Sequence, residues 1–208
     1  INAAANNNNA DAITLAQLQA VVGANAISAN LPAYRLAIVT AGTNTLSTAA
    51  PIQTLVDTAN TNATNEITNI NTAAGNTSAA NAITLAQLQA VVGANAISAN
   101  LTAYQLAIAG NNGSDLSTTA LIKTLVDGVN AATTAITAIN GAAVGGAGDT
   151  SLADAITLAQ LQAVVGADAI NTNLAVYQAA IFTANPGTLS TATLIQDLVN
   201  AANTNATT

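Results

Sequence analysis

A near-identical segment occurs three times in this chain, and it constrains the fold more than any other feature of the sequence. The copies are DAITLAQLQAVVGANAISANL from Asp11, NAITLAQLQAVVGANAISANL from Asn81 and DAITLAQLQAVVGADAINTNL from Asp154. A second shared segment begins 35 residues after each of these starts, at Leu46, Leu116 and Leu189. Length variation is therefore confined to the segments between copies. This pattern predicts rigid modules joined by linkers whose length can vary.

The repeat divides the chain into four parts. We assign residues 1–10 to the end of a preceding repeat, 11–80 to the first repeat, 81–153 to the second and 154–208 to the third, which is truncated in its last helix. Residues 1–10 align with the segment that starts at Ile70, and the last ten residues align with Val56–Asn65. We therefore expect the array to continue beyond both ends of this chain.

Each repeat opens with complete signals for a short helix. Thr14 followed by Gln17 is a capping box, and Ile13 with Leu18 forms a hydrophobic staple around it. Gly23 stands where a left-handed helix terminus would fall. The same residues recur at the matching positions of the second and third repeats. The pattern predicts a helix of two to three turns in every copy.

Two further helices are expected in each repeat. An apolar stripe of Ile27, Leu31, Tyr34 and Ile38 predicts a second short helix, and Pro32 places its start near Asn30 in the first repeat. Thr102 and Ala175 replace this proline in the other copies and permit an earlier start.

The third helix begins at Ser47 or Thr48 and continues for roughly 25 residues, about 38 Å. Its apolar positions in the first repeat are Ile52, Leu55, Val56, Ala59, Ala63, Ile67 and Ile70. We expect the two short helices to fold back along the long one, with loops after Gly75 and Gly141 joining successive modules. The predicted fold is all-α, a tandem array of small three-helix modules with one module per repeat of about 70 residues.

Composition removes most kinds of chemistry. The chain has no His and no Cys, so it lacks an imidazole base, a thiolate nucleophile and the usual zinc ligands. Two cations against nine acids cannot neutralise a run of phosphates, which argues against nucleic-acid binding. No stretch is apolar for long enough to span a membrane. We predict that the protein is not an enzyme and that it has no catalytic, cofactor-binding or metal-ligating residues.

The acidic residues are few and poorly retained between copies. Asp57 and Asp127 become Asn200 in the third repeat, and Asp11 becomes Asn81 in the second. We assign the acids to helix capping and solvation, with weak Ca²⁺ binding at the loop 111–115 as the alternative. The set comprises Asp11, Asp57, Glu66, Asp115, Asp127, Asp149, Asp154, Asp168 and Asp197.

Three other kinds of residue invite a functional interpretation. Tyr34, Tyr104 and Tyr177 recur at one position; we expect them to fill the core, and a sugar-stacking platform is the alternative. Arg35 and Lys123 occur in one repeat each, and we interpret both as incidental surface charges. Glycosylation sequons lie at Asn62, Asn76, Asn100, Asn112 and Asn205.

The motifs ITLAQLQAVVGA, NLxxYQxAI and a Ser/Thr-capped IQTLVDxxN together resemble the helical tandem repeats of large bacterial repetitive adhesins and S-layer-type extracellular proteins. The resemblance implies export, display at the cell surface and no catalytic residues. This chain differs from those repeats in its charge, because they carry many Asp and Glu residues and only 5% of the residues here are charged.

We therefore expect a non-catalytic extracellular protein that forms a stalk, filament or surface layer and associates with further copies of itself. The alternative is a binding module for ice or glycans. The threonines lack the regular 11-residue spacing expected of ice-binding helices.

Overall fold

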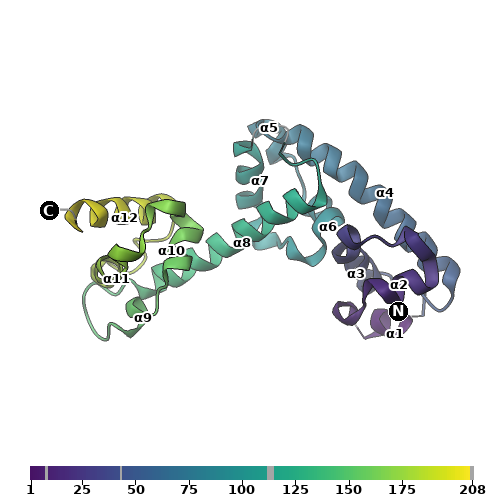
Figure 1. The fold of residues 1–208 in the computed structure, drawn as a ribbon, viewed down its shortest axis with the longest axis horizontal. Coiled ribbons are helices and arrows are strands. Elements are labelled where there is room, and N and C mark those ends of the chain that lie inside the picture. The colour runs from purple at the N-terminus through teal and green to yellow at the C-terminus, as the bar shows by residue number, and fades with distance from the viewer. Residues whose placement is uncertain (8, 43, 112–114, 207–208) are drawn as a thin grey trace. The chain divides into compact units, whose positions relative to one another are not determined.

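The computed structural model describes residues 1–7, 9–42, 44–111 and 115–206, and it is all-α over those ranges, with no strand. The chain forms two compact units, Ile1–Asp127 and Gly128–Thr208, here called unit 1 and unit 2. The division falls inside α8 (Figure 1). The helices are α1 (Asn2–Asn6), α2 (Leu15–Val22), α3 (Leu31–Thr40), α4 (Ala49–Ala73), α5 (Thr77–Asn81), α6 (Leu85–Val92), α7 (Leu101–Gly110), α8 (Thr119–Ala142), α9 (Ser151–Asp154), α10 (Leu158–Val165), α11 (Leu174–Thr183) and α12 (Ala192–Ala206).

The first predicted helix is present in every repeat as α2, α6 and α10, and each begins with the predicted capping box. In α2, Gln17 N–H donates to Thr14 Oγ1 at 3.2 Å, while Thr14 N–H donates to Gln17 Oε1 at 2.8 Å. Two backbone donors that the helix itself cannot satisfy are thus satisfied by side chains three residues apart. Ile13 and Leu18 are both buried in the same hydrophobic cluster.

The glycine that ends this helix does not adopt the expected left-handed helical conformation. Gly23, Gly93 and Gly166 have φ of 64°, 62° and 62°, but their ψ angles are −144°, −145° and −139°. This region of the backbone map is essentially restricted to glycine, because a Cβ would clash with the residue's own backbone. The requirement for glycine is therefore stricter than the sequence pattern predicted.

The second helix begins at the same position in all three repeats, as α3, α7 and α11. A 3₁₀ turn at Ser28–Asn30, Ser98–Asn100 or Asn171–Asn173 leads directly into each of them. Pro32 occupies the first turn of α3. Its replacement by Thr102 and Ala175 does not move the start to an earlier residue, because the preceding turn fixes it.

The long third helix is present as predicted. It is 25 residues long in α4 and 24 in α8, and α12 begins at the matching position. Thr48 is the N-cap residue of α4. Threonine is a poor helix former, and on α4 five threonine hydroxyls donate to the carbonyl four residues earlier. These threonines are Thr54, Thr61, Thr64, Thr68 and Thr72.

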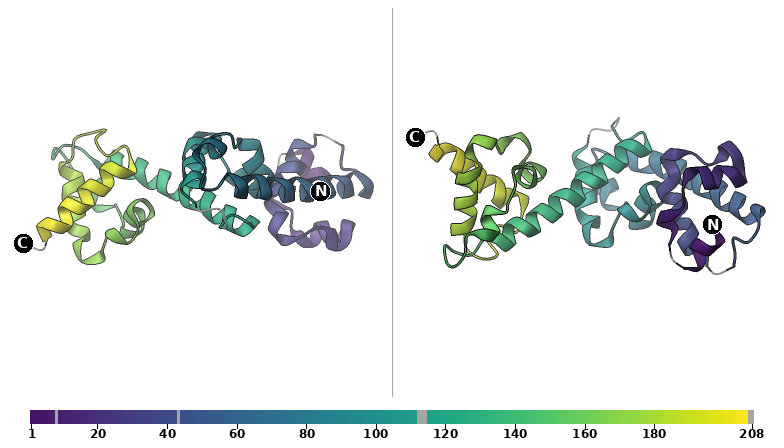
Figure 2. Two further views of the ribbon diagram at one scale, coloured as in Figure 1. Left: turned by 90° about the horizontal axis from the view of Figure 1, so that it is seen from above. Right: turned by 60° about the horizontal axis from the view of Figure 1, so that its bottom comes forward.

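Within unit 1, α4 packs against helices of both the first and the second repeat (Figure 2). Ile52, Val56 and Ala59 in the first half join a buried cluster with residues of α2 and α3. α4 also contacts α5, at the end of the first repeat, and α6 and α7, which belong to the second repeat. Asn71, near the end of α4, accepts a 3.3 Å hydrogen bond from Leu116 N–H. The short helices of the first repeat therefore cover only part of the long helix that follows them.

Unit 2 has a core of the same composition. Residues from the second half of α8 and from α9 to α12 form one buried cluster, in which Tyr177, Ile181 and Ile139 are fully buried. Asn140 accepts a 3.1 Å hydrogen bond from Leu189 N–H, as Asn71 does from Leu116 in unit 1. The segments expected to be plain loops after Gly75 and Gly141 contain the short helices α5 and α9, which the sequence analysis missed.

Candidate functional site

The repeated tyrosines are the most deeply buried polar side chains of the chain's described part. Tyr34, Tyr104 and Tyr177 are each 0% exposed, which confirms the prediction that they fill the core and is incompatible with a sugar-stacking surface. Each hydroxyl accepts a hydrogen bond from a backbone N–H seven residues earlier, at 3.1–3.2 Å. A buried hydroxyl needs such partners because an unsatisfied polar group is costly in the interior.

An asparagine on the long helix completes this network. The Tyr34 hydroxyl donates to Asn60 Oδ1, which also accepts from Asn30 Nδ2 at 2.8 Å, while Asn60 Nδ2 donates to the Asn25 carbonyl at 2.8 Å. Tyr177 and Asn203 repeat the arrangement in unit 2. These asparagines were not predicted from the sequence, although an Asn stands 49 residues after the start of every repeat.

Several acidic side chains of the described residues form separate hydrogen bonds and do not gather at one site. Asp149 Oδ1 accepts from Ser151 N–H at 2.9 Å at the start of α9, and Asp154 accepts from the Thr150 hydroxyl at 2.7 Å. Glu66 accepts from Asn69 and from Gln87, so it links α4 to α6. Among the described residues no three acids gather as they would around a metal ion.

The proposed alternative Ca²⁺ loop, 111–115, has three of its residues outside the described part of the chain, and so has the sequon at Asn112. The other four sequons, at Asn62, Asn76, Asn100 and Asn205, lie among the described residues. Asn62 is exposed on α4, whereas Asn100 is 6% exposed beneath the start of α7. A glycan cannot be attached to a side chain that the fold buries, so Asn100 is not a modification site in the folded protein.

Arg35 is not an incidental surface charge, which corrects the sequence interpretation. Its Nε and Nη2 atoms donate to the Ile13 carbonyl at 3.0 Å and 2.8 Å. Gln105 and Gln178 stand at the same repeat position and donate to the carbonyls of Ile83 and Ile156 at 2.8 Å and 2.9 Å. The position therefore requires a long side chain with an N–H donor, which fixes the second helix against the entry to the first.

A groove in unit 1 lies between α3, α4 and α6. Its volume is about 510 Å³, and alanine, leucine and threonine side chains form most of its walls. Gln89 reaches its rim and donates at 3.0 Å to the Ala96 carbonyl. No ionisable side chain lines this groove, so its walls offer shape and apolar contact without an acid, base or nucleophile.

None of the described helices is both long enough and apolar enough to cross a membrane. Comparison of the chain with protein-family models, with curated proteins and with solved structures finds no match.

Proposed function

We propose that this chain is a structural, non-catalytic repeat protein that acts outside the cell, as part of a stalk, filament or surface layer. In this proposal the repeats 11–80, 81–153 and 154–208 are three-helix modules of a tandem array, each with two short helices and one long helix. The partners are further copies of the same kind of module.

The observation that carries the proposal is the sharing of α4 between two repeats within unit 1. Residues of its first half are buried with α2 and α3, and the helix also contacts α6 and α7 of the second repeat. Hydrogen bonds from Gln87 to Glu66 and from Leu116 N–H to Asn71 tie the second half to the following repeat. A module joined in this way cannot pivot freely on its neighbour, because the linker is a packed helix and not a flexible loop.

Three features of the sequence and structure support a structural role over a catalytic one. The capping boxes and the Tyr–Asn networks recur, so the features kept between copies are those that stabilise the fold. The acids, by contrast, are exchanged for Asn between copies. A surface with few charges also has little long-range repulsion to oppose association of like modules.

Electron microscopy of the purified protein, with light scattering across a concentration series, tests the proposal. We expect extended particles or a mass that rises with concentration. Compact monomers at every concentration, with no extended or polymeric form in the images, would refute the structural role.

A further inference from the structure

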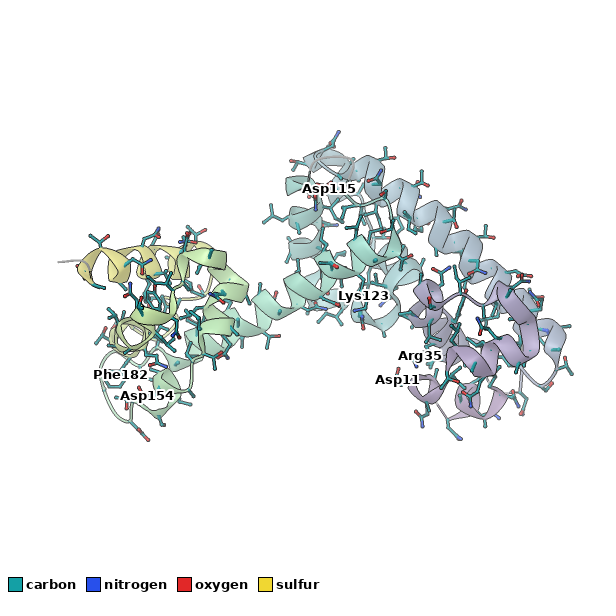
Figure 3. The ribbon with its side chains drawn as sticks, in the orientation of Figure 1. Asp11, Arg35, Asp115, Lys123, Asp154 and Phe182 are labelled. Atoms are coloured by element: carbon teal, nitrogen blue, oxygen red, sulfur yellow. The ribbon has the colours of Figure 1, made fainter. Side chains whose placement is uncertain are left out.

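The two cations of this chain come together at one cavity in unit 1. Arg35 on α3 and Lys123 on α8 both line a pocket of about 350 Å³, together with Asp11 (Figure 3). Its remaining walls are Ala10, Pro32, Leu36, Val39, Ala94 and Asn95. Arg35 belongs to the first repeat and Lys123 to the second, so the pocket is built by two repeats jointly.

Each of the two cations replaces a glutamine that the other copies of the repeat have at the same position. Gln105 and Gln178 occupy the position of Arg35 in the other copies, and Gln53 and Gln196 occupy that of Lys123. Glutamine is sufficient for the structural bond, since Gln105 and Gln178 make the contact to the equivalent carbonyl. The positive charge at these positions is therefore not needed to hold the helices together.

Arg35 and Lys123 each have more N–H donors than their hydrogen bonds to neighbouring protein groups use. The bonds of Arg35 to the Ile13 carbonyl use Nε and Nη2 and do not involve Nη1. Lys123 forms an ion pair with Asp127 one turn later on α8, and an ammonium group has three donors. In a chain of net charge −7, this pocket is the place where two positive groups face one volume. Each of these groups is of a kind that donates charge-assisted hydrogen bonds to an oxyanion.

We propose that this pocket binds the carboxylate of an acidic sugar, with Arg35 and Lys123 on the oxyanion and Asp11 accepting a hydrogen bond from a sugar hydroxyl. A volume of about 350 Å³ suits one monosaccharide unit. The site would let a structural protein hold an acidic polysaccharide. It does not depend on the structural role proposed above, because the pocket lies within one unit.

The test is a titration of the ¹⁵N-labelled full chain with glucuronate at constant ionic strength, followed by amide chemical shifts. We expect saturable shifts centred on the amides of residues 33–36 and 94–95, with a Kd on the order of 1 mM for so few contacts. Neutral glucose should leave these amides unchanged, and sulfate should bind more weakly because it offers no hydroxyl to Asp11. Absence of saturable shifts with glucuronate would overturn the site, and equal affinity for sulfate would overturn the assignment to a sugar.

The repeat itself supplies matched variants. Arg35→Gln and Lys123→Gln restore the residues of the other copies, so each should fold and each should weaken glucuronate binding at least fivefold. A fourfold variant, R35Q/K123Q/Q178R/Q196K, keeps the composition and net charge but moves both cations to the third repeat. It should not bind at the pocket. Retained affinity in this variant, or in R35Q/K123Q, would show that the attraction is not site-specific and would refute the proposal.

Discussion

Substitution of Gly93 by alanine separates a local backbone requirement from a contact between two repeats. Gly23 and Gly93 have the same conformation within 2° in φ and 1° in ψ, and both lie in unit 1. A Cβ at Gly23 would meet no atom within 4 Å, whereas a Cβ at Gly93 would lie 2.3 Å from the carbonyl oxygen of Pro32. The two glycines therefore differ in what a methyl group would touch and not in backbone strain.

The expected magnitudes follow from this difference. Alanine in this backbone region costs about 1–3 kcal/mol at either position. At Gly93 the methyl group must also displace the backbone of α3, which adds about 1–3 kcal/mol, as overpacking does elsewhere in protein interiors. For a unit of 127 residues, the additional loss corresponds to a further decrease in Tm of roughly 4–12 °C.

The assay is thermal unfolding of full-length Gly23→Ala and Gly93→Ala, combined with hydrogen exchange measured by peptide so that unit 1 is followed separately from unit 2. Gly166→Ala, whose Cβ would also meet nothing within 4 Å, is the matched control in unit 2. Equal losses of stability for the variants at Gly23 and Gly93 would refute the contact between Pro32 and Gly93 as an energetic feature of the fold.

Three further predictions concern the recurring features. Thr84→Ala should cost about 1 kcal/mol in urea unfolding, because it removes one half of a capping box, whereas Thr84→Ser should cost little; equal losses would contradict the role of the hydroxyl. Tyr177→Phe should destabilise unit 2 by about 2 kcal/mol, since the Ile170 N–H loses its acceptor and Asn203 Oδ1 loses a donor, and an unchanged stability would contradict the role of the hydroxyl. In a host that glycosylates secreted proteins, peptide mapping should find no glycan on Asn100 in folded material, and substantial occupancy there would contradict its burial.

The local parts of the fold were predictable from the sequence for a specific reason. The capping box of Thr14 and Gln17 and the start of α4 after Thr48 depend on residues at most a few positions apart. Interactions between residues so close in the sequence can be recognised from the residue types and their spacing alone. The short helices α5 and α9 were missed because they lack an apolar stripe long enough to reveal a helical period.

The candidate site was less predictable, since its residues are far apart in the chain. Arg35 and Lys123 are separated by most of unit 1, and sequence analysis interpreted each as an isolated surface charge. The pairing of Tyr34 with Asn60 was equally hidden, although both recur at constant spacing. A spacing of this length identifies a contact only when the path of the chain between the two residues is known.

The sequence by itself determined that this chain is helical, where the first and third helices of each repeat begin, and that a tyrosine, a glycine and a capping box recur in each copy. Those properties follow from short-range hydrogen bonding and from the period of the apolar residues. Only the tertiary structure decided that α4 serves two repeats, that Gly93 packs against Pro32, and that both cations line one pocket. These outcomes depend on which surfaces meet after the chain folds, because packing joins residues by their positions in space and not by their order in the sequence.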